Sequence, residues 1–225
     1  MRRSPLALAY LCAIAAALNP LQVCHHKTCA KNGLARRTLD IAHVLGGPEA
    51  AVPTAACQSG CNAGTVSLVG RRLYDVERAS AATLAAILEI ELGVAVTDAA
   101  VDACDKLAAA DAAQRRGDKD VARDILRALL DDSAALAAAP RLEALAAVRL
   151  FDLLAGEAAQ REALEPILIR SAEHDTAATW RLAASRGARG DCAGQRDVLI
   201  ALTKREPAAI DAARELIESC DVTYT

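Results

Sequence analysis

The sequence predicts two folded parts, a small α+β domain over residues 21–93 and an all-α helical domain over residues 98–225. Short apolar runs of the kind that form strands occur only in the first part, together with two helix-like segments. After residue 98, apolar residues recur at helical spacing, and turn residues separate the segments. Alanine, the best helix former, supplies 54 of the 225 residues, whereas aromatic residues make up only 2% of the chain.

Composition excludes several classes of protein. With 53% hydrophobic residues, the chain can bury a core and is not a disordered tail. The formal net charge is −3, the pI is about 5.8, and the charges are dispersed along the chain. A nucleic-acid binder needs a basic field to displace counterions from phosphates, so we expect no nucleic-acid partner.

Residues 1–20 are predicted to be a targeting leader. Arg2 and Arg3 precede an apolar run over residues 5–18, which is too short to span a bilayer, since a spanning helix needs about 20 residues. This is the layout of a signal peptide, and the alanines at residues 15–17 supply a cleavage site. We therefore expect no stable membrane span after leader removal. The alternative is that the run is a buried N-terminal helix.

The leader also suggests a compartment. Its junction, AAALNP, is similar to the two-part plastid-targeting leaders of algae with secondary plastids. This likeness predicts a plastid location that is reached through a signal-type leader. The alternative is the secretory pathway or the extracellular space.

The first domain should contain a strand, a helix, three strands and a helix, in that order. Strands are expected over residues 21–23, 51–56, 65–69 and 73–76, and helices over residues 32–45 and 80–92. Ser80 is a favourable N-cap for the second helix, and Gly93 is a favourable C-cap.

Four cysteines of this domain have the spacing of a ligand set. Four residues separate Cys24 from Cys29, and three separate Cys57 from Cys61. Each pair falls where a predicted strand gives way to a loop, so the four thiolates could converge at one end of the sheet. Such a set suits a [2Fe–2S] cluster or a tetrahedral zinc ion. Disulfides or unligated thiols are the alternative interpretation.

The segment VCHHKTCAKNG, the later C-x3-C-x-x-G and the run VSLVGRRLYDV together resemble the thioredoxin-like [2Fe–2S] ferredoxin family. The resemblance covers residues 21–93, about a third of the chain. It implies a thioredoxin-like fold in which Cys24, Cys29, Cys57 and Cys61 hold one [2Fe–2S] cluster. It also implies electron transfer or redox sensing, with a redox partner near the cluster.

The second part is predicted to be a series of helices. Its segments cover residues 98–116, 118–130, 141–155, 157–171, 176–186, 195–205 and 208–219. Pro166 should kink or split the segment in which it lies. An apolar stripe is expected at Val121, Ile125, Leu126 and Leu129.

A repeat of 34 residues runs through these helices. Gly156 and Gly190 are 34 residues apart, as are Leu168 and Leu202. Residues 108–140 resemble a tetratricopeptide repeat, with small alanines in the first helix, Gly-Asp at the turn and a closing proline. The resemblance implies a stacked array with a concave surface that docks a protein partner. The alternative is that Ala-rich helical hairpins imitate the pattern.

Neither part carries a recognisable catalytic motif. The sequence has no Walker loop, no GxGxxG after a strand, no GxSxG and no HExxH. Cys104, Cys192 and Cys220 are isolated along the sequence and are expected to be small buried hydrophobic residues. The chain should therefore be an electron carrier or scaffold rather than an enzyme.

Two functions follow from these observations. The first is a [2Fe–2S] protein for electron transfer or redox sensing, whose helical repeats dock a protein partner. The second is a secreted or lumenal interaction module whose cysteines form disulfides and bind no cluster, because oxidising compartments favour disulfides.

Overall fold

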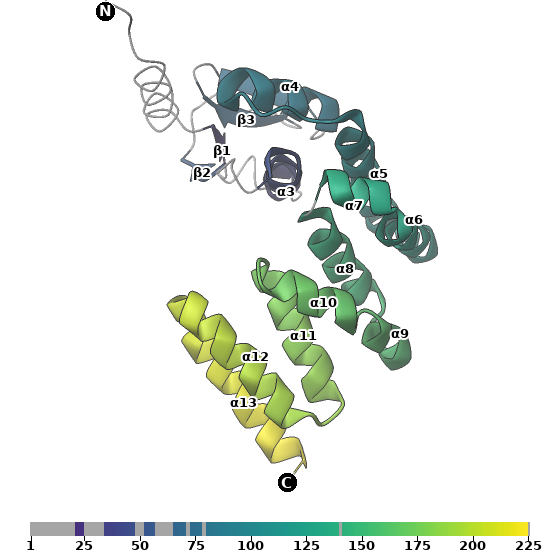
Figure 1. Cartoon of the computed structure of the whole chain (residues 1–225), viewed down its shortest axis with the longest axis vertical. Helices are drawn as coiled ribbons and strands as arrows, with labels where there is room; N and C mark the ends of the chain where they lie inside the picture. Colours follow the sequence, from purple (N-terminus) through teal and green to yellow (C-terminus); the bar gives the residue numbers. More distant parts are fainter. Residues whose placement is uncertain are drawn as a thin grey trace, which may run out of the picture. The chain divides into compact units, whose positions relative to one another are not determined.

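The structure is a computed structural model, and it describes residues 21–24, 34–47, 52–56, 65–70, 73–77, 80–139 and 141–224 (Figure 1). The chain divides into two compact units. Unit 1 extends to Ala108 and includes residues 137–140, and unit 2 comprises residues 109–136 and the chain from Arg141 onward. The predicted leader, residues 1–20, lies outside the described residues.

Unit 1 contains a small sheet. Its strands are β1 (Gln22–Cys24), β2 (Thr54–Ala55), β3 (Thr65–Val69) and β4 (Leu73–Glu77), in the order β2-β1-β3-β4. β1 is parallel to β2, with Cys24 opposite Ala55, and antiparallel to β3. β3 and β4 form an antiparallel hairpin.

Two helices pack against each other in unit 1, namely α3 (Leu34–Gly46) and α4 (Ala81–Leu92), and α3 also contacts β1 and β3. The Ser80 side chain caps the start of α4 by accepting a hydrogen bond from the Thr83 N–H. The left-handed Gly93 ends the helix, as its lack of a Cβ allows. Leu84 and Leu88 are fully buried and supply the core-facing stripe of α4.

A buried carboxylate links α4 to the β3–β4 hairpin. Glu91 of α4 accepts a hydrogen bond of 2.6 Å from the Tyr74 hydroxyl of β4. Gly70 lies so close to Glu91 that a Cβ there would be 2.6 Å from the carboxylate oxygen. Glycine at this hairpin turn therefore makes room for the glutamate.

The predicted fold class is wrong. The structure is mostly all-α, so the expected N-terminal α+β domain of thioredoxin-like ferredoxin type is not supported. The strands are only two to five residues long, and β1 and β2 share just two residue pairs. The four short strands lie close to where the apolar runs predicted them, but they are outweighed by the helices of this alanine-rich, aromatic-poor chain.

The described residues beyond Asp98 are helical and contain no strand. The helices are α5 (Asp98–Arg116), α6 (Lys119–Asp131), α7 (Ser133–Ala138), α8 (Arg141–Leu153), α9 (Ala158–Ala163), α10 (Glu165–Ala172), α11 (Thr176–Ala188), α12 (Cys192–Arg205) and α13 (Ile210–Tyr224). A 3-10 turn, η2 (Pro207–Ala209), precedes α13. The chain was expected to split near Pro166, and α9 ends just before it while α10 carries this proline in its first turn.

The helices of unit 2 pack in chain order around buried leucines. α8 contacts α6, α10 and α11, and α12 contacts both α11 and α13 (Figure 1). Leu168 of α10 and Leu202 of α12, which are 34 residues apart, are both fully buried. Gly156 and Gly190, also 34 apart, both have a left-handed backbone at a turn between helices.

The buried stripe of α6 differs in one respect from the expected one. Ala122, Leu126 and Leu129 are buried, whereas Val121 is 51% exposed. The period of the helix therefore turns Val121 away from the side that packs on α8.

Candidate functional site

The structure places one of the four predicted cluster ligands. Cys24 is the last residue of β1 and is fully buried, together with Leu21 and Val23. Cys29, Cys57 and Cys61 lie outside the described residues. Within the part of the chain that the structure describes, no three His, Cys, Asp or Glu side chains group so that they could hold a metal ion. The cluster therefore stays a prediction.

Two cysteines that the sequence suggested were isolated are joined. Cys192, the first residue of α12, forms a disulfide with Cys220 of α13, with their Cα atoms 5.8 Å apart. The expectation that both are merely small buried hydrophobic residues is wrong. Cys104, the third member of that group, is buried in α5 as expected.

The sequence does contain a signal for this disulfide. Cys192 and Cys220 are 28 residues apart, and Glu206, between α12 and η2, lies midway between them. In an antiparallel helical hairpin, residues at equal distances from the turn face each other. The Cys192–Cys220 pairing can be predicted if α12 and α13 are recognised as one antiparallel hairpin whose turn lies at Pro207.

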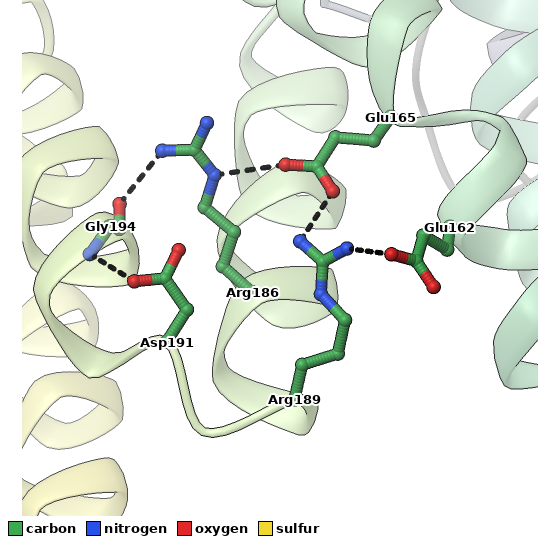
Figure 2. Close-up of polar contacts among 6 residues, drawn as sticks. All are labelled: Glu162, Glu165, Arg186, Arg189, Asp191 and Gly194. Carbon is green, nitrogen blue, oxygen red and sulfur yellow. Dashed lines mark hydrogen bonds and ion pairs between the residues drawn. The ribbon is translucent and has the colours of Figure 1, made fainter.

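A network of ion pairs and hydrogen bonds joins residues 162–165, the end of α11 and the first turn of α12 (Figure 2). Glu165 of α10 accepts a hydrogen bond of 3.1 Å from Nε of Arg186, and its other oxygen accepts one from Nη2 of Arg189. Nη1 of Arg189 also donates to Glu162, at 2.8 Å. The largely buried carboxylate of Glu165 thus holds Arg186 of α11 and Arg189, the residue that caps the C-terminal end of α11.

The same network reaches the first turn of α12. Nη1 of Arg186 donates a hydrogen bond of 3.2 Å to the carbonyl oxygen of Gly194. The Gly194 N–H donates to the Asp191 carboxylate at 2.9 Å, which makes Asp191 the N-cap of α12 (Figure 2). The backbone on both sides of Cys192 is therefore held in place by side chains of α11 and by the cap.

Two arginines of this region, Arg189 and Arg181, have a raised pKa. Desolvation is the largest single influence on the pKa of Arg189 and lowers it, but the hydrogen bonds and charges of Glu165 and Glu162 together raise it. Arg181 forms an ion pair with Asp152, and the hydrogen bond to Asp152 raises the pKa of Arg181. Partial burial lowers this pKa, whereas the charges of Asp152 and Asp175 raise it further. Both guanidinium groups stay charged, so the ion pairs act as structural links.

Close packing also ties α11 to α12. Gln195 is buried, and a Cβ added to Gly187 would lie 2.5 Å from its amide nitrogen. The ion pairs and this contact link α11 to α12, and the disulfide links α12 to α13.

No helix among the described residues is long and apolar enough to cross a membrane. Comparison with protein-family models, with curated proteins and with solved structures found no match. No family is therefore assigned, and the function is argued from the residues alone.

Proposed function

We propose that this chain is a disulfide-stapled helical module that binds a protein partner in an oxidising compartment. The observation that carries this proposal is the disulfide between Cys192 and Cys220. Disulfides persist in secreted and lumenal proteins and are rare where glutathione and thioredoxin keep thiols reduced. The basic and apolar start of the sequence has the layout of a signal peptide, which supports the same compartment.

Partner binding is supported by the surface of unit 2. Large aliphatic side chains of three helices are exposed, namely Val121 of α6, Ile169 of α10 and Ile200 of α12. We take these side chains as the candidate contact points, because exposed apolar surface is what a protein partner covers when it binds.

The compartment is tested by fusing residues 1–20 to a redox-sensitive fluorescent protein. The expected result is a reporter that reads oxidised inside a membrane-bounded compartment. A matched fusion without residues 5–18 should read reduced in the cytosol. A reduced reading from the full leader would contradict the proposal.

Partner binding is tested by photo-crosslinking in the source cell. A photo-reactive residue in place of Ile169 or Ile200 should give a discrete adduct with another protein. The same residue in place of Glu215, an exposed polar position on α13, is the matched control and should give none. Absence of an adduct at both isoleucine positions would refute docking on these helices.

A second candidate function has its own supporting observation. β1 and β2 are parallel, with Cys24 opposite Ala55, and Cys57 follows Ala55 by two residues in the sequence. Parallel strands end at the same edge of a sheet, which is the placement a shared ligand set needs. In this proposal Cys24, Cys29, Cys57 and Cys61 hold a [2Fe–2S] cluster, which would supply one-electron transfer.

The two candidates are separated by metal analysis of anaerobically purified protein. A cluster protein should be reddish-brown and contain two iron and two sulfide per chain. Cys24→Ser should abolish the colour, whereas Cys104→Ser, at a buried cysteine outside the ligand set, should keep it. A colourless protein after competent reconstitution would exclude the cluster and leave the first proposal standing.

A further inference from the structure

The last helix of the chain is held by few buried side chains. Among residues 210–220 of α13, only Ala213 and Cys220 are buried, and Cys220 is itself half of the disulfide. Leu216 and Ile217 are partly buried against the same core. A single helix of this length is marginal in water without tertiary packing.

A small apolar cluster lies beneath α13. It consists of Ala183 of α11, Leu199 and Leu202 of α12, and Ala213 of α13. Trp180 and Val198 pack against it. If α13 moved away, leucine side chains that are now fully buried would meet water.

The two ends of α13 are tied down in different ways. Its start follows directly from α12 through η2, so the chain itself keeps this end close. Its far end, near Cys220, is held covalently to the start of α12 by the disulfide. The start of α12 is in turn fixed by the Asp191 cap and the Arg186 hydrogen bond (Figure 2). The disulfide therefore joins a rigid anchor to a sparsely packed helix.

We infer that the Cys192–Cys220 disulfide is a redox switch that keeps α13 over the apolar cluster, and that reduction releases α13 and exposes the cluster. The inference goes beyond the proposed function, although it rests on the same disulfide. The released surface, built from Leu199, Leu202 and Trp180, would then be open to an apolar segment of a partner.

The reductant is a dithiol protein or compound. One of its thiolates attacks the sulfur of Cys192, which is half-buried at the start of α12, while Cys220 is buried. The disulfide breaks, a mixed disulfide forms on Cys192, and Cys220 leaves as a thiolate that takes a proton. The second thiol of the donor then displaces Cys192, which leaves as a thiol, and the donor becomes a disulfide. Two electrons and two protons have passed to the chain.

The switch is tested on the full chain by titration with dithiothreitol. Trp180 is the only tryptophan in the sequence, so its emission reports on the cluster. Reduction should shift this emission to longer wavelength. Hydrogen-exchange protection of the α13 amides should fall on the order of a hundredfold, while protection in α8 is unchanged.

Two variants serve as controls. Cys192→Ser with Cys220→Ser should show the released state without reductant, and Cys104→Ser should respond to dithiothreitol as the natural chain does. If the double variant fails to fold, exchange in the reduced natural chain still decides the question.

Three outcomes separate the claims. Release of α13 on reduction supports the switch. A disulfide whose reduction leaves Trp180 emission and α13 protection unchanged overturns the switch but not the proposed function. Free Cys192 and Cys220 thiols in protein from its own compartment overturn both.

Discussion

At the scale of single residues, Glu165 is the centre of the ion-pair network in unit 2. Its carboxylate is 14% exposed and accepts hydrogen bonds from two arginines, whereas the Glu162 side chain is 59% exposed and accepts one. When one partner of a buried ion pair is removed, the other charge stays buried without compensation, and the protein is destabilised. An ion pair exposed to solvent contributes little to stability. The two glutamates should therefore differ in their contribution to stability.

We expect Glu165→Gln to lower the free energy of unfolding by about 1–3 kcal/mol, because both Arg186 and Arg189 lose a charged acceptor. Glu162→Gln is the matched control and should cost less than about 0.5 kcal/mol. Urea unfolding followed by Trp180 emission measures both. Equal effects of the two substitutions would show that burial of the network does not matter.

The contact between Gly187 and Gln195 gives a second residue-scale prediction. Alanine at position 187 gains about 1 kcal/mol of helix propensity, but its Cβ would lie 2.5 Å from Nε2 of Gln195. Overpacking of this kind costs about 1–3 kcal/mol, so Gly187→Ala should be neutral to destabilising in the natural chain.

A double-mutant cycle isolates this clash. With Gln195→Ala as background, Gly187→Ala should stabilise the protein, and the coupling between the two changes should reach about 1–3 kcal/mol. Urea unfolding of the four proteins gives the coupling. Additive effects would mean that Gln195 simply moves aside.

At the scale of elements, Arg205 at the end of α12 closes the C-terminal end of α10. Its Nη1 donates hydrogen bonds of 2.7 and 2.8 Å to the carbonyl oxygens of Ala172 and Glu173, and its Nη2 donates to Thr179. The last carbonyls of a helix have no partner within the helix, and a cation there also suits its dipole.

We expect Arg205→Leu to cost about 1–2 kcal/mol of unfolding free energy, because three hydrogen bonds are lost. The Ala172 carbonyl keeps the Thr179 hydroxyl as a donor, which limits the loss. Lys204→Leu removes the neighbouring charge without removing these hydrogen bonds, so it should stay within about 0.5 kcal/mol. Thermal unfolding of the two variants tests the difference. If Arg205→Leu and Lys204→Leu lowered the unfolding free energy equally, the effect would come from the change in net charge and not from the loss of the helix cap.

Helix positions were largely predictable from the sequence, but tertiary pairing was not. The bounds of α5 and the split beside Pro166 agree with local propensity and proline sterics. The six-residue α7 was missed, since a short Ala-rich stretch has no clear apolar period. The Cys192–Cys220 pair was missed because the two residues meet only through the fold of the α12–α13 hairpin.

The error in fold class has a different cause. The strand predicted over residues 65–69 coincides with β3. However, the sequence of one five-residue strand does not predict how many other strands pair with it or how long they are. Strand pairing is non-local, and β2 proves to be only two residues long. The helices dominate the structure because alanine, which supplies 54 of the 225 residues, favours them.

At the scale of the whole molecule, the chain consists of two compact units, and the disulfide lies in unit 2. A cross-link that closes a loop of this size stabilises a protein by about 3–4 kcal/mol in the chain-entropy model. We expect reduction to lower the urea midpoint of the Trp180 transition, which reports on unit 2. Circular dichroism, which sums both units, should then show a second transition whose midpoint does not change on reduction. If reduction shifted every transition in both signals by the same amount, the two units would not unfold independently, which would contradict this prediction.

The central claim is that Cys192 and Cys220 are paired in the natural protein, and disulfide mapping tests it most directly. Protein from its own compartment is alkylated without reductant, digested and analysed by mass spectrometry. The account predicts a cross-linked pair of peptides that contain Cys192 and Cys220, and no alkylation of either. Alkylated Cys192 and Cys220, or linkage of either to another cysteine, would contradict it.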